Sequence, residues 1–315
     1  MKKHLSVLAL GLVTLLSACV KSNTNNLKIV SPTGAPAVAF YNFADNDNYT
    51  TNSTPANIVA MMTKDGPDVV VIDGISGIKA LKNNAPYKYL ATITFGNFYV
   101  AKTGNDDDNT LNDGDNVLIF GQGQTPDILF NRIYNNLNLN KSYVANVNQA
   151  STCLCSGKNL DNQDLDYVVI AQPILQKILG DKTCATANKN GIYADLQEKY
   201  QEANNNAKVI QASIFVKNSL DKDVVMDFAT TLKNDIEKAI KNPELIQEGF
   251  SKVDADVATS KFGIAAQMAI NVLKNNNGLG LGFEYGKDLK QDFQLFLEYF
   301  NEEMYSDNLV FDYES

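Results

Sequence analysis

KIVSPTGAPAVAF, residues 28–40, passes from a β-type apolar run to a helical apolar spacing across a loop that contains Pro32, Gly34 and Pro36. The same change recurs in TTNSTPANIVAMM (50–62), VLIFGQGQTPDILF (117–130) and YVVIAQPILQKIL (167–179). Proline at the first position of a helix loses no hydrogen bond and presets φ, so each stretch predicts a strand, a tight turn and a helix. The expected caps and prolines are Gly34 and Pro36, Thr54 and Pro55, Thr125 and Pro126, and Gln172 and Pro173.

A fifth junction of this type, DVVVIDGISGIKAL (68–81), uses Asp73 and Gly74 in place of proline. Repeated strand-to-helix units predict an α/β fold with mostly parallel sheets flanked by helices. In such sheets the carboxyl ends of strands and the amino ends of helices share one edge, and ligands bind there.

The periodicity predicts strands at 27–31, 49–53, 68–73, 87–102, 116–120, 143–147, 166–171 and 207–218. It predicts helices at 35–43, 55–64, 75–83, 126–137, 150–157 and 173–179, and a helical C-terminal part at 221–240, 243–253, 261–275 and 287–304. Residues 275–286, NNNGLGLGFEYG, lack the glycine spacing of a nucleotide fingerprint and predict a loop with a short strand. Two βα series joined by two long strands predict two lobes around a cleft: 27–100 with 216–315 form lobe I, and 101–215 form lobe II.

The first nineteen residues, MKKHLSVLALGLVTLLSAC, combine two lysines, an apolar stretch too short to span a bilayer comfortably, and small residues before Cys19. This pattern predicts a lipoprotein signal peptide over 1–18, lipid carried by Cys19, and a flexible tether over 19–26. An ordinary secretory signal with a chance cysteine is the alternative. We expect an extracytoplasmic monomer that is lipid-anchored to a bacterial membrane.

Composition excludes several classes of function. His4 is the only histidine and would leave with the signal peptide, which argues against Ser-His-Asp or Cys-His catalysis and against zinc hydrolysis. We therefore expect no enzyme, no metal and no cofactor. The formal charge is −9, and removal of Lys2 and Lys3 makes it more negative by two. Arg132 is the only arginine, so the sequence predicts no basic surface for nucleic acid.

Three cysteines remain in an oxidising setting, where Cys184 could pair with either Cys153 or Cys155 and leave one thiol over. A Cys-x-Cys metal site is the rival interpretation, but its fourth ligand is missing. The segment TGNDDDNTLNDGD (103–115) is either a solvated loop or a calcium loop. No glutamate closes an EF-hand register after Asp106-Asp107-Asp108, which favours the solvated loop.

The predicted lipidation sequence that ends at Cys19 (a lipobox) and the tether are followed by six characteristic segments. In order, these are PTGAPAVAF, PDVVVIDGISGIKAL, TFGNFYVAK, GQGQTPDILFNRI, DLDYVVIAQPI and IQASIFVKN. The chain thereby resembles the substrate-binding lipoproteins of ABC importers, in particular the nitrate, sulfonate, taurine and thiamine-precursor group with the type 2 periplasmic-binding-protein fold. The resemblance runs from about 27 to 299. It implies a small-molecule pocket between two lobes and a membrane permease as the partner.

The resemblance also implies which residues contact the ligand. From lobe I these are Ser31, Thr33, Gly34, Ala35, Asp73, Gly74 and Ser76; from the crossing strand, Phe95, Asn97 and Phe98; and from lobe II, Gly121, Gln122, Gln124, Thr125 and Gln172. Two departures put the ligand identity in doubt: STCLC replaces ordinary helix residues, and Gln172 stands where a carboxylate is often found. Bare helix amides favour an anionic or strongly polar group, although Thr54 and Thr125 could merely cap their helices.

The aromatic residues near the proposed cleft are Tyr41, Phe43, Phe95, Phe98 and Tyr99. They either stack on a flat heteroaromatic ligand or fill the core. Arg132 falls about two turns into its helix and offers no clamp for an oxyanion, so a neutral or aromatic nutrient is preferred over a sulfonate or nitrate. The expected function is a transport receptor. An enzyme of the same fold is opposed by the missing histidine, whereas a surface adhesin or sensor lipoprotein would share every feature.

Overall fold

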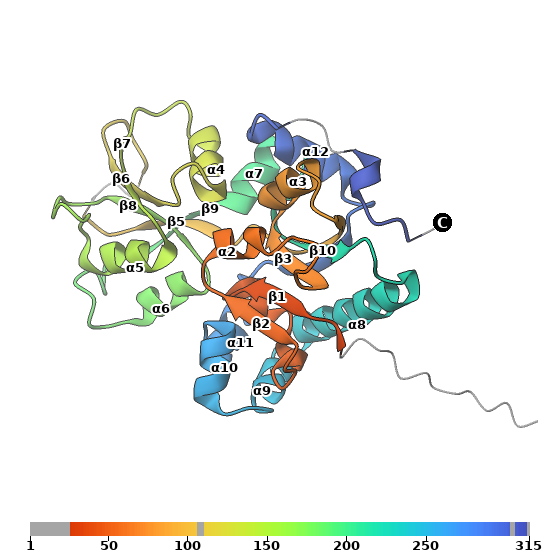
Figure 1. Ribbon diagram of the computed structural model, residues 1–315. Helices are drawn as coiled ribbons and strands as arrows, with labels where there is room; N and C mark the ends of the chain where they lie inside the picture. Colours follow the sequence, from red (N-terminus) through yellow and green to blue (C-terminus); the bar gives the residue numbers. More distant parts are fainter. Residues whose placement is uncertain (1–25, 106–109, 303–305, 314–315) are drawn as a thin grey trace, which may run out of the picture.

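The computed structural model describes residues 26–105, 110–302 and 306–313. The expected signal peptide (1–18), the lipidation site Cys19, the tether up to residue 25, and the Asp106-Asp107-Asp108 run lie outside the described residues. Two α/β lobes, each built on one sheet, make up the described chain (Figure 1). The two-lobed architecture predicted from the sequence is confirmed.

The first lobe contains a six-stranded sheet in the order β11-β4-β10-β3-β1-β2. Its strands are β1 (Ile29–Pro32), β2 (Tyr49–Asn52), β3 (Val69–Asp73), β4 (Tyr87–Phe95), β10 (Ile210–Lys217) and β11 (Leu281–Tyr285). β1 pairs in parallel with β2 and β3, whereas β10 runs antiparallel to both β3 and β4. The sheet is therefore mixed: β1, β2, β3 and β4 run in one direction, and β10 and β11 run in the opposite direction.

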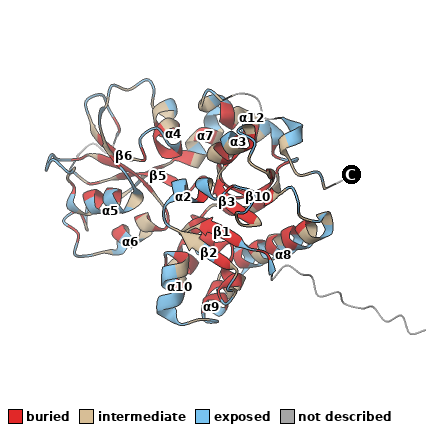
Figure 2. Ribbon diagram, in the orientation of Figure 1, coloured by how far each residue is buried: buried red, intermediate tan, exposed pale blue. Residues whose placement is uncertain are grey.

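Helices cover both faces of this sheet. The first-lobe helices are α1 (Ala35–Val38), α2 (Pro55–Ala60), α3 (Gly74–Lys82), α8 (Lys222–Lys241), α9 (Leu245–Phe250), α10 (Ala255–Phe262), α11 (Ala266–Lys274) and α12 (Lys290–Tyr299), with short turns η2 (Tyr41–Phe43) and η3 (Asp307–Leu309). Val69 and Val71 of β3 pack into the core beneath α1 and α8–α11, whereas Val70 and Ile72 pack toward α2, α3 and α12. This alternation follows from the period of two of a strand, and both faces are buried (Figure 2).

The second lobe contains a five-stranded sheet in the order β7-β6-β8-β5-β9. Its elements are β5 (Phe98–Lys102), β6 (Asn116–Phe120), α4 (Thr125–Ile133), β7 (Asn140–Val144), α5 (Val147–Ser156), β8 (Tyr167–Ala171), α6 (Ile174–Gly180), β9 (Gly191–Asp195) and α7 (Leu196–Ala203). β6 is parallel to β7 and β8, and β5 is antiparallel to β8 and β9. Side chains of α4 and α7 share one hydrophobic cluster with both lobes, so the two sheets are linked by a common core.

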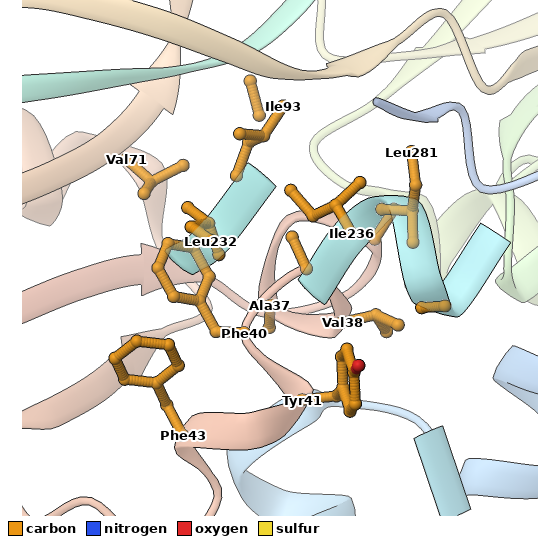
Figure 3. Close-up of a cluster of buried hydrophobic side chains, with 14 of the residues drawn as sticks. Ala37, Val38, Phe40, Tyr41, Phe43, Val71, Ile93, Leu232, Ile236 and Leu281 are labelled. Carbon is orange, nitrogen blue, oxygen red and sulfur yellow. The ribbon is translucent and has the colours of Figure 1, made fainter. Parts of the chain in front are cut away.

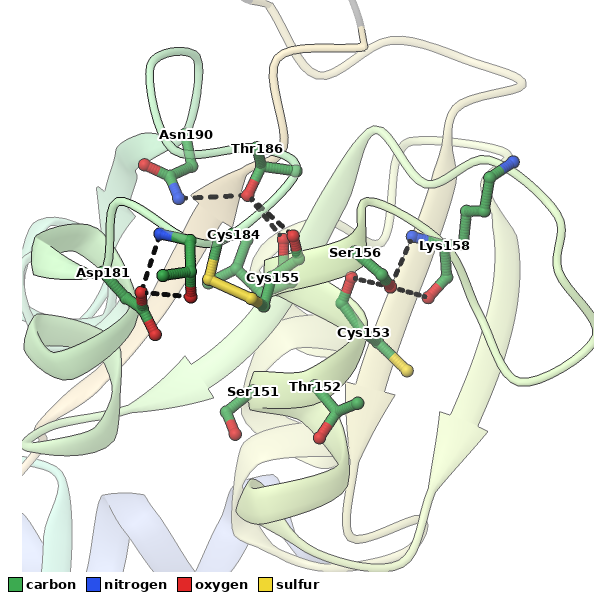
Figure 4. The surroundings of a disulfide bond; sticks show 12 residues. Ser151, Thr152, Cys153, Cys155, Ser156, Lys158, Asp181, Cys184, Thr186 and Asn190 are labelled. Atoms are coloured by element: carbon green, nitrogen blue, oxygen red, sulfur yellow. Dashed lines mark hydrogen bonds between the residues drawn. A yellow bond between two sulfur atoms is a disulfide. The ribbon is translucent and has the colours of Figure 1, made fainter.

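A disulfide joins Cys155 of α5 to Cys184, and Cys153 is free and buried. The sequence allowed Cys184 to pair with Cys153 or with Cys155, and in the structure it pairs with Cys155. The Cys153 side chain points away from the bridge (Figure 4).

The structure corrects several predicted elements. The strand expected over 87–102 is two strands in different sheets, interrupted at Gly96 and Asn97, whose φ values are 72° and 68°. The expected helix over 261–275 corresponds to α11, which begins only after left-handed Gly263, and most of α10 was not predicted. The expected helix over 35–43 ends at Val38, and a 3-10 turn follows.

Two elements of lobe II also differ from the prediction. The strand expected over 143–147 is β7 at Asn140–Val144, and both β9 and α7 were missed within a polar, Asn-rich stretch. The chain changes sheets at Gly96–Asn97 and again between Asp195 and Ile210. The first change comes a few residues before position 100, and the second comes well before position 216, the two positions where the chain was expected to pass between the lobes.

Candidate ligand site

The carboxyl edges of the two sheets meet at the point where the chain crosses between lobes. β1, β2, β3 and β4 run in one direction and end at Pro32, Asn52, Asp73 and Phe95. In lobe II, β6, β7, β8 and β9 end beside the start of β5, because Phe98 pairs with Ala171 and Tyr99 pairs with Asp195. Gly96 and Asn97 alone separate Phe95 from Phe98. We call the loops after β1, β3, β6 and β8, together with Gly96–Asn97, the inter-lobe junction.

Asn97 and Gln172 are in direct contact at this junction. The Gln172 amide N–H donates to the Asn97 carbonyl at 3.0 Å, and Asn97 Nδ2 donates to the Gln172 carbonyl at 3.3 Å. Both side chains are almost fully buried, with 4% and 5% of their residue surface exposed. The structure thus brings together two candidate residues, one from the crossing segment and one from the loop between β8 and α6.

Gln197 of α7 ties the two crossing segments to each other, and sequence reasoning missed it. Its Oε1 accepts from the Val209 amide at 2.9 Å, and its Nε2 donates to the Ala207 carbonyl at 3.4 Å. The Gly96 amide donates to the Val209 carbonyl at 3.2 Å. A Cβ at Gly96 would lie 2.6 Å from Gln197 Cβ, so glycine is required there. The available signal was Asp195, whose carboxylate caps α7 by accepting from the Gln197 amide.

The loop after β1 is largely occupied by contacts within lobe I. The Ser31 hydroxyl is fully buried and shares a hydrogen bond of 2.8 Å with the Tyr49 hydroxyl. The Gly34 amide donates to the Phe262 carbonyl at 2.8 Å, at the C-terminal end of α10. Thr33 lies against Gly263, and Ala35 is buried. These contacts stabilise the lobe, so the loop holds fewer unpaired amides than its sequence predicted.

Asp73 and Ser76 form the cap of α3 at the end of β3. Asp73 Oδ1 accepts from the Ser76 amide at 2.8 Å. A Cβ at Gly74 would lie 2.9 Å from both Ile210 and Phe293, so Gly74 allows α3 to pack closely on the sheet. Burial raises the pKa of the Asp73 carboxyl above its usual value, although hydrogen bonds from Ser76 partly oppose the shift.

Replacing Asp73 by asparagine is expected to increase the free energy of unfolding at pH 7. A raised folded-state pKa means that this carboxyl favours folding below its unfolded pKa, and that the contribution is lost as pH rises through the folded value. Asparagine caps helices as well as aspartate does, so Asp73→Asn removes the buried charge and keeps the cap. Urea unfolding at pH 7 and below pH 4 measures the effect.

The matched control for Asp73→Asn is Asp221→Asn, at the exposed residue preceding α8. We expect the gain in stability to be large at pH 7 and small in acid for Asp73→Asn, and absent at both pH values for the control. Equal unfolding curves for Asp73→Asn and the wild type at pH 7 would contradict the proposed desolvation.

The loop after β6 is folded by its own hydrogen bonds. The Gly121 amide donates to the Val144 carbonyl at 2.9 Å, and the Gly123 amide donates to Asp127 Oδ2 at 2.8 Å. Thr125 is the first residue of α4, while Gln124 occupies the cap position and makes no side-chain cap hydrogen bond. Thr54 makes none at α2 either. Thr54 thus occupies the cap position of α2 without a side-chain cap bond, whereas Thr125 is not the cap residue of α4. Gln122 and Gln124 are exposed at the junction.

The aromatic candidates belong mainly to the hydrophobic cores. Tyr41 and Phe43 pack with Phe40 in the hydrophobic core of lobe I (Figure 3). Phe98 lies 6.1 Å from Phe120 between ring centroids, and Tyr99 is 8% exposed. Phe95 alone of the five candidates is partly exposed, with the Lys208 ammonium 5.4 Å from its ring centroid.

The lobes touch on both sides of the crossing. The Tyr99 hydroxyl donates to the Gly278 carbonyl at 3.5 Å, and Arg132 Nη2 donates to Asn301 Oδ1 at 3.2 Å. α6 contacts α11, and α4 contacts α12. Two surface hollows, of about 350 and 420 Å³, lie elsewhere: one at the amino edge of the lobe II sheet near Asn116 and Lys141, the other near Asn42 and Asp235. The expected cleft between the lobes is not one of these two hollows.

No family model matches the chain, and no curated protein matches it. Several solved structures are similar to it. An ABC transporter structure from Parabacteroides distasonis is 16% identical, with 91% of this chain and 98% of that chain covered and a TM-score of 0.72. The periplasmic aliphatic sulphonate binding protein SsuA from Escherichia coli is 10% identical, with 91% and 92% covered and a TM-score of 0.62. The chain has the type 2 periplasmic-binding-protein fold.

The type 2 periplasmic-binding-protein fold also occurs in an enzyme. A mutant form of DszB, in complex with biphenyl-2-sulfinic acid, is 12% identical, with 90% of this chain and 96% of that chain covered and a TM-score of 0.56. Within the described residues, no cluster of three histidine, cysteine, aspartate or glutamate side chains could hold a metal ion. Over those same ranges, every helix is too short or too polar to cross a membrane.

Proposed function

We propose that this protein is the extracytoplasmic solute-binding lipoprotein of an ABC importer, which captures a small polar or heteroaromatic nutrient between its lobes and delivers it to a membrane permease. The observation that supports this most strongly is the meeting of the two carboxyl edges across Gly96–Asn97. Loops from both lobes, with their helix amino ends, thereby converge on one place, as ligand-binding α/β sheets require.

The hinge of the proposed receptor comprises Gly96–Asn97 and the segment between α7 and β10. Separation of the lobes would break the Tyr99–Gly278 and Arg132–Asn301 hydrogen bonds and part of the shared hydrophobic cluster. A solute stabilises the closed form only if it makes contacts there that it does not make in the open form. Loop residues after β1, β3, β6 and β8 would supply those contacts, with Thr33, Ser76, Gln122, Gln124 and Gln172 the side chains that remain best placed.

The proposed receptor carries out no chemistry. His4 is the only histidine, and the free thiol of Cys153 is buried, which raises its pKa and leaves it a poor nucleophile. Cys19 would carry the lipid, and residues 19–26 would connect the membrane to the first strand, which fits a monomeric receptor held near its permease.

A solute screen on the purified mature protein tests this function. A bound solute at one hundred times its Kd stabilises the folded state by about 2.7 kcal/mol, so the melting temperature should rise by several degrees. We expect one class of vitamins, pyrimidines, sulfonates or oxyanions to produce the shift, and small-angle scattering to show a smaller radius of gyration with that solute. The protein should first be unfolded, dialysed and refolded, so that any solute retained from the cell is removed.

Two further measurements complete the test. Mass spectrometry of the untreated protein should find the same solute class that raises the melting temperature. If the screen gives no thermal shift and the untreated protein carries no small molecule, the transport receptor is contradicted and a surface adhesin or sensor lipoprotein takes its place.

A further inference from the structure

Asn97 carries an acceptor atom that the protein leaves without a partner. Its Nδ2 group donates a hydrogen bond to the Gln172 carbonyl at 3.3 Å. Its Oδ1 atom, in contrast, is buried and accepts no hydrogen bond from any described residue. Only 4% of the residue's surface is exposed, and the residue lies at the crossing where both carboxyl edges meet. A buried amide oxygen without a donor is unfavourable and is rare in folded proteins.

Local rearrangement does not remove this mismatch. Exchanging the amide oxygen and nitrogen would place Oδ1 against the Gln172 carbonyl, so two acceptors would face each other. The backbone of Asn97 is left-handed, with φ 68°, a conformation that asparagine and glycine tolerate better than other residues. Asn97 therefore suits this position in two ways: its backbone makes the turn between sheets, and its Oδ1 atom is held at the junction.

The charges around the junction also suit a donor. Asp73 ends β3 and Asp195 ends β9, so each carboxyl edge carries an acidic residue. Three cations of this region are already engaged: Lys208 forms an ion pair with Glu284, Lys79 forms one with Glu302, and Arg132 bonds Asn301. An oxyanion beside Asn97 Oδ1 would bring two acceptors together, whereas a group that donates a hydrogen bond would satisfy the orphan oxygen.

We propose that Asn97 Oδ1 accepts a hydrogen bond from an N–H group of the solute, so that the protein selects neutral or cationic nitrogen compounds and discriminates against oxyanions. This inference rests on the proposed solute-binding function. The acceptor is buried when the lobes are together, and a donor that satisfies it therefore binds the closed form better than the open one. Asn97 would thus contribute both to specificity and to closure.

Matched pairs of solutes test the inference. One member of each pair has an N–H donor and the other has it replaced by N-methyl groups: nicotinamide against N,N-dimethylnicotinamide, and 2-aminopyridine against 2-(dimethylamino)pyridine. Methanesulfonate and nitrate form the oxyanion arm. Binding to the mature wild-type protein is compared with binding to Asn97→Gly, which keeps the left-handed backbone. The matched control is Asn162→Gly, because Asn162 has φ 61° but lies exposed in lobe II.

We expect the wild type and Asn162→Gly to prefer the N–H member of a pair at least tenfold, and Asn97→Gly to bind both members with similar, weaker affinity. A purely structural role would weaken both members equally and leave their ratio unchanged, and that result overturns the inference. So does tight binding of methanesulfonate or nitrate that Asn97→Gly does not alter, although the receptor function would then stand. If no solute in any arm binds the wild type, the inference fails, and the receptor function is decided separately by the solute screen and by mass spectrometry of the untreated protein.

Discussion

Phe215→Ala is expected to lower the free energy of unfolding by about 3–5 kcal/mol, because it removes a buried ring and leaves a cavity against the six-stranded sheet. Phe215 is fully buried in β10 and pairs across the sheet with Val70 and Tyr89. Its ring lies 5.6 Å from that of Tyr89 between centroids. Chemical denaturation with fluorescence and circular dichroism measures the loss, and Leu160→Ala, at a side chain that is 66% exposed, should stay within about 0.5 kcal/mol of the wild type.

Gly77 of α3 provides a sharper test of the same packing. A Cβ at Gly77 would lie 2.0 Å from Phe215 Cζ, so Gly77→Ala alone should cost about 1–3 kcal/mol. In the Phe215→Ala background the added methyl group has space, and alanine is the better helix former, so the same change should be nearly neutral or stabilising. A double-mutant cycle then shows strong coupling between the two positions. Strictly additive effects would mean that α3 does not rest on the Phe215 ring.

Loss of the Cys155–Cys184 bridge is the second large effect. The bond closes a loop with a sequence separation of 29, and the chain-entropy relation for a loop of that length gives about 3–4 kcal/mol of stabilisation. The double variant Cys155→Ser with Cys184→Ser should therefore unfold at a clearly lower denaturant concentration than the wild type. Dithiothreitol should shift the wild type to the same midpoint and leave the variant unchanged.

The free cysteine two residues away supplies the control. Cys153→Ala keeps the bridge and should lose only about 1 kcal/mol by removing one buried sulfur atom. Near the bridge, the Thr186 hydroxyl donates to the Leu154 carbonyl at 2.8 Å, and Asn190 Nδ2 donates to Thr186 Oγ1 at 3.1 Å (Figure 4). Reduction should loosen this segment first, so proteolysis within 181–190 should accelerate in the double variant but not in Cys153→Ala. The opposite order would show that Cys153 is the structural thiol.

The strand-to-helix junctions were predictable because their signals are local. Proline, glycine or aspartate at each turn determines where a strand can stop and a helix can begin, and those preferences act within a few residues. For the same reason the candidate loops after β1, β3, β6 and β8 could be named in advance. Their binding role remains a prediction.

The crossing between lobes was mistaken for one strand because apolar alternation continues through it. Each half, 87–95 and 98–102, is buried in its own sheet, so the pattern is the same as in a single long strand. The Gly96-Asn97 dipeptide was the available turn signal. β9 was missed for the opposite reason: Ile192 is 42% exposed, and the strand forms by pairing with β5, not through its own apolar content.

By itself, the sequence determined the βα units, the two-lobed class, the absence of histidine beyond residue 4 and the positions of the strand-to-helix turns, because each depends on composition or on neighbours along the chain. Only the tertiary structure decided that Cys155 and not Cys153 pairs with Cys184, that Gly34 and Ser31 are engaged by Phe262 and Tyr49, and that Asn97 keeps an unpaired acceptor. These outcomes depend on which segments, far apart in the sequence, are brought together by packing. The spacing of residues along the chain does not determine those contacts.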